Sequence, residues 1–344
     1  MKNNNFALYN ASCYGLSEVA DLSVDALITD PPYGIGFQNH AWDKALPDPR
    51  IWSDALRVLK PGAFGLVFSS VRLMHRLMVA LEDAGFEIKD VIFWSYLNGM
   101  PKSRDVSLAI DKELGMESEV VGSYRYVQGY RGENHKSEIG HYRAPGGRTL
   151  GDRTPVEQGS GQVSGIKKKR RAVSRIGQQY RGAGLGIKPA YEPVILVQKP
   201  KAPGLTVAQN ILKYGTGALN LEETRIPLEC GEAPVGHNPH PLGRVCANYL
   251  RTEPWQDGYD KFFMVPKVRQ HKDSFNSHPT LKPTALMEHL VKLVSFEGQT
   301  VLDPFAGSGS TGVAALQRRR QFVGYEKDAT YYEIMNRRMT DCLG

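Results

Sequence analysis

The sequence predicts an α/β protein with a mostly parallel sheet, and three observations lead to this fold class. Short apolar runs alternate with stretches of helical spacing near both ends of the chain, as in a sheet whose strands are joined by helices. Glycines and prolines separate these stretches. The middle of the 344-residue chain lacks the alternation. We therefore expect one sheet assembled from both chain ends, with an inserted region between them.

The N-terminal third contains the first strands and helices of this sheet. Its first apolar run stops at Pro31-Pro32, and its first helical stretch ends at the breaker Lys60-Pro61-Gly62. Gly85 follows the second helical stretch as a C-terminal cap. The predicted strands are residues 25–30, 65–69 and 88–94, and the predicted helices are residues 50–59 and 71–84.

The C-terminal third repeats the pattern after one further apolar run. Leu286, Leu290 and Val294 share one helical face, which predicts an amphipathic helix. The predicted strands are residues 192–198, 300–303 and 321–325, and the predicted helices are residues 284–295, 309–319 and 329–340.

The middle of the chain is basic and rich in glycine. Residues 122–188 hold 14 lysines and arginines against 4 acids, a surplus of ten positive charges that exceeds the +7 of the whole chain. With 14 glycines in residues 122–186 and few large apolar side chains, this stretch predicts a long loop or a weakly ordered insertion. Such a charge favours a polyanion partner, most simply nucleic acid, over the alternative of a solvated insertion.

Composition also excludes several classes of protein. No run of 18 apolar residues exists, so we expect no membrane span. The N-terminus has no apolar signal region, and the four cysteines are scattered, which fits a reducing cytoplasm. The nine histidines show no ligand spacing, so we expect no metal site.

A glycine turn joins the predicted strand 300–303 to the helix after it. Gly307 and Gly309 would let a ligand approach the backbone and the helix N-terminus, and Glu326 ends the next strand. An acid at that position can accept hydrogen bonds from both hydroxyls of a ribose. The pattern predicts a nucleoside-containing cofactor; the alternative is a packing turn beside a surface glutamate.

The tetrapeptide Asp30-Pro31-Pro32-Tyr33 stands at the carboxyl end of a predicted strand, the edge where α/β sheets bind ligands. Asp30 is a carboxylate acceptor, and the two prolines fix the direction of the Pro31 carbonyl. These two acceptors suit the two N–H groups of an amine on an aromatic ring, and Tyr33 offers a flat face to a base swung out of a duplex. The alternative is a structural Pro-Pro turn.

With these motifs the chain resembles the amino-methylating DNA methyltransferases that use S-adenosylmethionine. Asp30-Pro-Pro-Tyr33 is similar to their catalytic motif, and the stretch from Asp303 to Gly309 is similar to their cofactor loop. The stretch from His278 to Pro283 resembles the motif ahead of that loop. The motif order, catalytic first, is that of the β group, which implies a seven-stranded, mostly parallel sheet and a homodimer.

The resemblance implies site residues of three kinds. The catalytic ones are Asp30, Pro31, Pro32 and Tyr33. The cofactor-binding ones are Asp303, Pro304, Phe305, Ala306, Gly307, Ser308, Gly309, Thr311, Glu326, His278, Lys282 and Asn10. Lys282 would neutralise the cofactor's carboxylate, and the alternative is a surface lysine. Family members carry an acid near Asn10, and here Asn10 or Ser12 would replace it through neutral hydrogen bonds.

The basic insertion gains a role from this resemblance, because an enzyme on duplex DNA needs phosphate contacts and base-reading side chains. Tyrosines are interleaved with its arginines. The predicted DNA contacts are Lys167, Lys168, Lys169, Arg170, Arg171, Arg175 and Arg181. We expect a catalytic domain of residues 1–121, 189–203 and 271–344, a DNA-contacting insertion of residues 122–188, and a candidate target-recognition region of residues 204–270.

The predicted function is sequence-specific methylation of adenine N6 in duplex DNA, by a bacterial or phage-type enzyme that acts alone or in a restriction–modification pair. The Asp-Pro-Pro-Tyr form usually accompanies adenine in this family, and cytosine N4 is the nearest alternative. RNA or protein glutamine as substrate, and a non-catalytic DNA-binding protein, are more distant alternatives. The intact Asp30 and Pro31 speak against the last of these.

Overall fold

The computed structural model describes residues 4–36, 40–96, 105–126, 165–187, 189–227, 240–250, 275–276 and 281–343. The chain forms two compact units, one of residues 1–99 and 190–344 and the other of residues 100–189. Among the described residues, no helix is long and apolar enough to cross a membrane.

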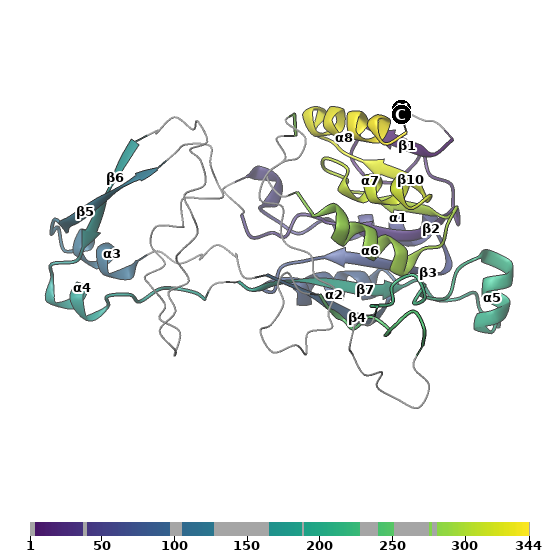
Figure 1. Ribbon diagram of the computed structural model, residues 1–344, viewed down its shortest axis with the longest axis horizontal. Helices are drawn as coiled ribbons and strands as arrows, with labels where there is room; N and C mark the ends of the chain where they lie inside the picture. The colour runs from purple at the N-terminus through teal and green to yellow at the C-terminus, as the bar shows by residue number, and fades with distance from the viewer. Residues whose placement is uncertain are drawn as a thin grey trace. The chain divides into compact units, whose positions relative to one another are not determined.

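An eight-stranded sheet organises the first unit, in the order β1-β10-β9-β2-β3-β7-β4-β8 (Figure 1). The strands are β1 (Phe6–Tyr9), β2 (Val24–Thr29), β3 (Leu59–Phe68), β4 (Glu87–Ser95), β7 (Tyr191–Gln198), β8 (Tyr249–Leu250), β9 (Thr300–Asp303) and β10 (Gln321–Tyr325). The prediction of a mostly parallel sheet built from both chain ends is confirmed. The predicted count of seven strands is wrong, since eight strands lie in the described part of the chain.

One strand, β7, runs against the others. It is antiparallel to both of its neighbours, β3 and β4, whereas the remaining pairs are parallel. Val194 on β7 pairs with Phe68 at the end of β3, and Glu192 pairs with Trp94 near the end of β4. The beginning of β7 therefore lies at the edge where the parallel strands end.

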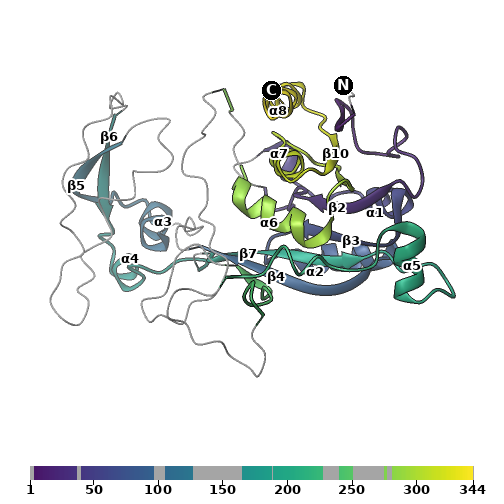
Figure 2. The same ribbon diagram turned by 45° about the vertical axis from the view of Figure 1, so that its right-hand side comes forward.

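Helices cover both faces of the sheet, which makes three layers (Figure 2). Alternate residues of β2 show the division, since Leu27 packs with α1 and α2 on one face and Ile28 with α6 and α7 on the other. The helices of this unit are α1 (Pro49–Val58), α2 (Met74–Asp83), α5 (Val207–Tyr214), α6 (Thr284–Val294), α7 (Ser310–Gln317) and α8 (Ala329–Asp341). All six residues of β2 are buried, as expected of a strand covered on both faces.

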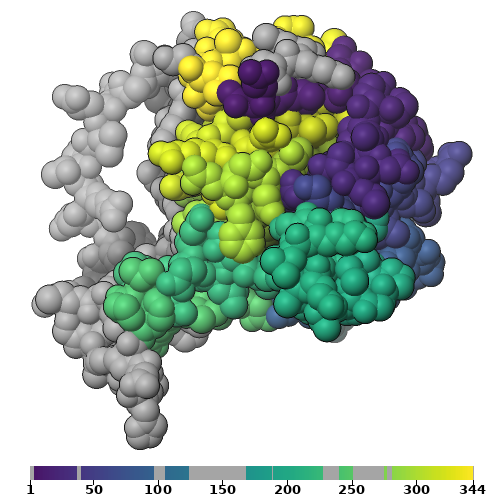
Figure 3. Space-filling view, turned by 90° about the vertical axis from the view of Figure 1, so that its right-hand side faces the viewer, coloured from purple at the N-terminus to yellow at the C-terminus, as the bar shows by residue number. Residues whose placement is uncertain are grey.

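The two ends of the chain meet within this unit. β1 pairs in parallel with β10, so that Phe6 lies opposite Phe322. Figure 3 shows the N-terminal residues in purple beside the C-terminal residues in yellow. This adjacency brings motifs that are far apart in the sequence to one sheet.

The breaker Lys60-Pro61-Gly62 ends α1 as predicted, but these residues lie inside β3 rather than in a turn. The register with β2 jumps from Val24–Leu59 to Ala26–Phe64, so the strand bulges there. The bulge accommodates a proline, which cannot donate to a neighbouring strand, and Gly62 with a φ of 82°.

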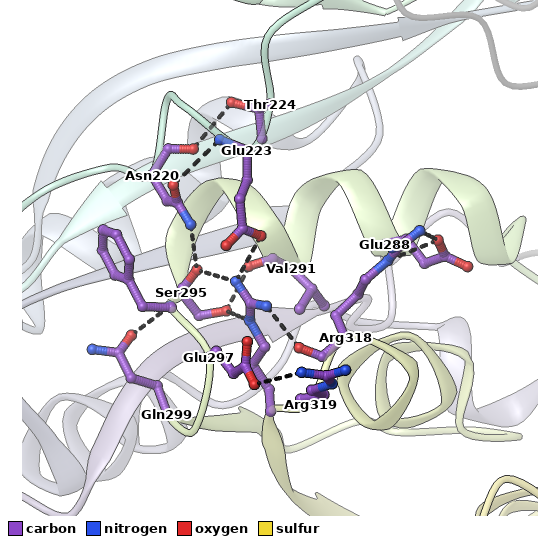
Figure 4. A network of polar contacts seen from close by, with 12 residues as sticks. Asn220, Glu223, Thr224, Glu288, Val291, Ser295, Glu297, Gln299, Arg318 and Arg319 are labelled. Carbon is purple, nitrogen blue, oxygen red and sulfur yellow. Dashed lines mark hydrogen bonds and ion pairs between the residues drawn. The ribbon is translucent and has the colours of Figure 1, made fainter. Parts of the chain in front are cut away.

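The segment 216–227 is fastened to the sheet unit through a buried arginine. Arg320, 4% exposed, donates to the Ser295 carbonyl at 2.8 Å and pairs with Glu223 at 3.1 Å. Asn220 donates its backbone N–H to the Leu293 carbonyl at 2.9 Å. Figure 4 shows Asn220 and Glu223 reaching the turn after α6. This network lies at the N-terminal end of β10, away from the edge where the parallel strands end.

The second unit contains a hairpin of β5 (Glu119–Tyr126) and β6 (Gly165–Arg171), with α3 (Val106–Glu113) and α4 (Arg175–Gln179). The expectation of a loop or weak order over residues 122–186 is therefore wrong for residues 122–126 and 165–179. Asp111 of α3 holds the unit together, because its carboxylate accepts from the Val173 N–H at 2.7 Å and from the Ser174 hydroxyl at 2.6 Å. Hydrogen bonds from Ser174 hold the pKa of Asp111 below its usual range.

Candidate active site

Two adjacent strands bring the catalytic and glycine-turn motifs together. β2 pairs with β9, with Leu27 opposite Leu302, and each strand leads directly into one of the motifs. The Thr29 hydroxyl donates to the Asp303 carboxylate at 2.7 Å across this pair. Asp30 follows Thr29, so the two motifs share the carboxyl edge of the sheet, where ligands bind in such folds.

Asp43 holds the catalytic tetrapeptide in place. Its buried carboxylate accepts from the backbone N–H groups of Tyr33, at 2.6 Å, and Gly34, at 2.9 Å. Gly34 has a φ of 68°, and a Cβ there would come within 3.0 Å of the Leu46 nitrogen, so the turn needs glycine. Among the described residues, none donates a hydrogen bond to the Pro31 carbonyl.

Asp30 lies in a cluster of ionisable side chains. The Tyr33 hydroxyl donates to Asp30 Oδ1 at 2.7 Å, and the Lys282 ammonium donates to Asp30 Oδ2. Lys282 Nζ also lies 3.6 Å from Glu192 Oε2 and 4.8 Å from the centre of the Phe68 ring. Lys282 is 9% exposed, so this ammonium is buried between two carboxylates.

Burial and charge set the protonation of this cluster. Burial by itself would lower the pKa of Lys282, but the two neighbouring carboxylates outweigh it and the pKa is raised. Burial and the nearby carboxylates raise the pKa of Tyr33 well above its ordinary value. The tyrosine is therefore a neutral hydrogen-bond donor and the lysine a permanent cation at neutral pH.

The glycine turn is held by Asp303 from within. Beyond the bond from Thr29, its carboxylate accepts from the Thr311 hydroxyl at 2.6 Å and the Phe305 N–H at 3.1 Å. Burial raises the pKa of Asp303 to about 7, against the effect of these donors. Gly309 has a φ of 82°, and a Cβ on it would come within 2.8 Å of Met335 Cγ. Asp303 therefore fixes the turn, and any side chain larger than that of glycine at position 309 would clash with Met335.

Glu326 ends β10 beside this turn. One carboxylate oxygen accepts from the Gly307 N–H at 3.0 Å and the other from the Asp328 N–H at 2.8 Å. Asn10, just after β1, donates from its side-chain amide to the Glu326 carbonyl at 2.8 Å. The glycine turn and Glu326 thus lie together, as the sequence predicted for a nucleoside ligand, and Asn10 lies beside them.

The structure brings together most of the predicted site residues in the first unit, and His278 lies outside the described residues. Lys282 contacts Asp30 and Glu192, rather than standing on the surface. Sequence reasoning missed Glu192 and Asp43. Glu192 lies near the start of β7, a strand that the sequence predicts. Glu192 reaches the site only because β7 runs antiparallel to its neighbours.

The predicted DNA contacts of the second unit lie on β6 and around α4. Lys168, Lys169, Arg175 and Arg181 are exposed. Arg171 pairs with Glu119 at 2.7 Å, while Arg170 lies 3.7 Å from Glu117. The side chain of Lys167 lies outside the described part of the structure. No group of three potential metal ligands occurs among the described residues of either unit.

Comparisons with known proteins agree with this geometry. The N6/N4 methyltransferase family, described as DNA methylase, matches residues 24–139 and 158–337. The type II methyltransferase M.HindIII of Haemophilus influenzae is 24% identical, over 96% of this chain and 94% of that protein. DNA adenine methyltransferase YhdJ of Escherichia coli is 42% identical, over 48% of this chain and 51% of that protein.

A solved structure shares the fold. The cytosine-N4-specific PvuII DNA methyltransferase superposes with a TM-score of 0.52 at 12% identity, covering 99% of this chain and 92% of that chain. The family match spans most of the chain, including both motifs of the site. This chain therefore belongs to the N6/N4 DNA methylase family.

Proposed function

We propose that this DNA methylase transfers a methyl group from S-adenosylmethionine to N6 of adenine at a specific sequence in duplex DNA. One observation carries the proposal: the Asp30 carboxylate and the Pro31 carbonyl lie at the same sheet edge as the glycine turn. The Asp-Pro-Pro-Tyr form of the motif and the resemblance to an adenine methyltransferase support adenine as the target.

The glycine turn fits a nucleoside-containing cofactor. Gly307 has a φ of 54° and is only half-buried, so a ligand could approach its backbone without an intervening Cβ. Glu326 would hold the ribose hydroxyls, and Asn10 would stand near the adenine. When bound, S-adenosylmethionine supplies a methyl group on a sulfonium sulfur, which keeps the electron pair of the broken C–S bond.

The chain's own residues orient the target amine. Its nitrogen is a poor nucleophile because its lone pair is delocalised into the ring. Asp30 and the Pro31 carbonyl accept its two N–H bonds, so the nitrogen pyramidalises and its lone pair forms the new N–C bond. The methylated nitrogen then carries one proton too many, which passes to the Asp30 carboxylate and on to solvent. Tyr33 stacks on the extruded base.

The hairpin of the second unit supplies phosphate contacts in this proposal. Lys168 and Lys169 are exposed cations on one strand, as a sequence-independent electrostatic contact requires. Residues 204–270 remain the second candidate for reading bases.

We also propose a homodimer, in which each subunit helps to hold DNA for the other. Its basis is the resemblance to the β group. Sedimentation equilibrium should show a dimer at micromolar concentration, and monomer alone would count against it.

The proposal is tested by incubating the purified protein with labelled S-adenosylmethionine and plasmid DNA and hydrolysing the product to nucleosides. We expect label in N6-methyldeoxyadenosine. Label in N4-methyldeoxycytidine would keep the site but reassign its base. Label absent from DNA, with the cofactor still bound, would reject the proposed substrate.

A further inference from the structure

Lys282 faces two carboxylates although the chemistry proposed above uses only one. Asp30 comes from the end of β2, Glu192 from the start of β7, and Lys282 from the segment before α6. The ammonium donates to Asp30 and lies 3.6 Å from Glu192 Oε2. Both carboxylates are largely shielded, with side chains 24% and 17% exposed, so their charges are only partly screened by solvent.

A lysine paired with Asp30 alone would weaken the reaction. As the N–C bond forms, positive charge moves onto the target amine, and a negative acceptor stabilises that charge. An ammonium that fully neutralised Asp30 would remove this effect. A second carboxylate on the same ammonium leaves the cluster with one net negative charge.

We propose that Glu192 is a positioning residue that shares the Lys282 ammonium and so keeps Asp30 an effective acceptor for the target amine. This inference rests on the proposed methyl transfer. Glu192 acts through Lys282 and does not itself touch the base.

The surroundings of Glu192 suit this role. The Tyr33 hydroxyl oxygen lies 3.4 Å from Glu192 Oε2, and Glu192 accepts a hydrogen bond from the Tyr96 hydroxyl. Tyr96 is 5% exposed, and burial together with Glu192 raises its pKa, so it stays a neutral donor. The hydrogen bond from Tyr96 holds the carboxylate where it faces Lys282. The antiparallel direction of β7 is what places it there.

The test is a double-mutant cycle of Glu192→Gln and Lys282→Met, measured by single-turnover methylation of DNA with saturating cofactor. In the otherwise native chain, Glu192→Gln should lower the methylation rate roughly 10²-fold, as losses of transition-state charge stabilisation do. In the Lys282→Met background the same substitution should change the rate little, because the ammonium that Glu192 shares is gone. An equal loss in both backgrounds, or no loss in the native chain, would overturn the proposal.

Three further measurements separate this role from a structural one. Glu192→Asp keeps the charge and should restore much of the rate. DNA and cofactor affinities of Glu192→Gln should match those of the unsubstituted chain, so that the loss is in kcat rather than KM. Glu288→Gln, which removes a carboxylate from Arg318 just after the C-terminal end of α7, away from the site, is the matched control and should keep full activity. A Glu192→Asp variant as slow as Glu192→Gln would also overturn the proposal.

Methylation by the unsubstituted chain distinguishes a failure of this inference from a failure of the proposed function. If it methylates adenine while the cycle shows no coupling, the role of Glu192 is wrong and the function stands. If it methylates no DNA, the function itself has failed.

Discussion

At the scale of single residues, the proposed chemistry gives Asp30 the most direct part, because its carboxylate would accept the target amine. Asp30→Ala should reduce methyl transfer by roughly 10³-fold, as removal of a positioned transition-state acceptor does. DNA affinity should remain nearly intact, since the side chain lies in the catalytic cluster and not on the basic hairpin. Single-turnover methylation and a DNA-binding titration measure the two effects. A comparable loss of binding would mean that Asp30 is structural.

Asp303 stabilises the glycine turn, and its titration should make the stability of the protein depend on pH. Its pKa is raised by burial from 3.8 to about 7, so the folded state binds its proton more tightly than the unfolded state does. The stability that the protonated form contributes is present below about pH 4 and is lost as pH rises through 7.

Asp303→Asn keeps a side-chain oxygen that can accept from Thr29 and Phe305, but it removes the carboxyl group that titrates. The free energy of unfolding of the variant, relative to that of the unsubstituted chain, should therefore rise between pH 4 and 7, by at most about 1.4 kcal/mol per pH unit. Urea denaturation at several pH values measures it. A constant difference across this range would show that Asp303 does not titrate as the structure implies.

The sequence identified the candidate site residues that stand in a local motif, and it missed those whose place depends on the three-dimensional fold. Asp30 and the glycine turn were predictable because each ends a short apolar strand. Asp43 lies ten positions beyond Tyr33 in the chain, and nothing local marks its carboxylate as the acceptor for that backbone. The pairing of Lys282 with Asp30 joins residues 252 positions apart, which no local pattern encodes.

At the scale of elements, β6 is the strand that we expect to contact DNA phosphates. Lys168 and Lys169 are exposed cations on this strand, where they could meet phosphates. Changing both lysines to alanine should weaken DNA binding for all sequences alike. The slope of log K against log salt should fall by about one for each phosphate that the protein no longer neutralises.

Lys89→Ala is the control for this prediction, because Lys89 is an exposed cation on β4 in the other unit. It should leave the salt dependence unchanged. If the double substitution on β6 also leaves the slope unchanged, that strand does not contact the DNA backbone.

Elements with regular apolar patterns were predictable, and those without them were not. β7 and α6 carry apolar runs that mark them in the sequence. β6 consists of glycine, isoleucine and five consecutive cations, so it shows no alternation to indicate a strand. Its strand character depends on pairing with β5, which is a property of the folded hairpin. The continuation of β3 through Pro61 was hidden by a bulge.

At the scale of the whole molecule, the proposed methyl-transfer site and the basic hairpin belong to different units. The sheet unit contains both motifs of the site, and the second unit contains the basic hairpin. This division implies that loss of hairpin charge should affect DNA affinity, whereas changes in the Asp30 cluster should affect the rate of transfer.

The most direct test of adenine methylation through Asp30 is to express the protein in a host that lacks adenine methylation and to sequence the host DNA with detection of modified bases. We expect N6-methyladenine at one recurrent sequence with the unsubstituted chain, and none with Asp30→Ala at equal expression. N6-methyladenine that persists in the Asp30→Ala culture, or modification confined to cytosine in the unsubstituted one, would contradict it.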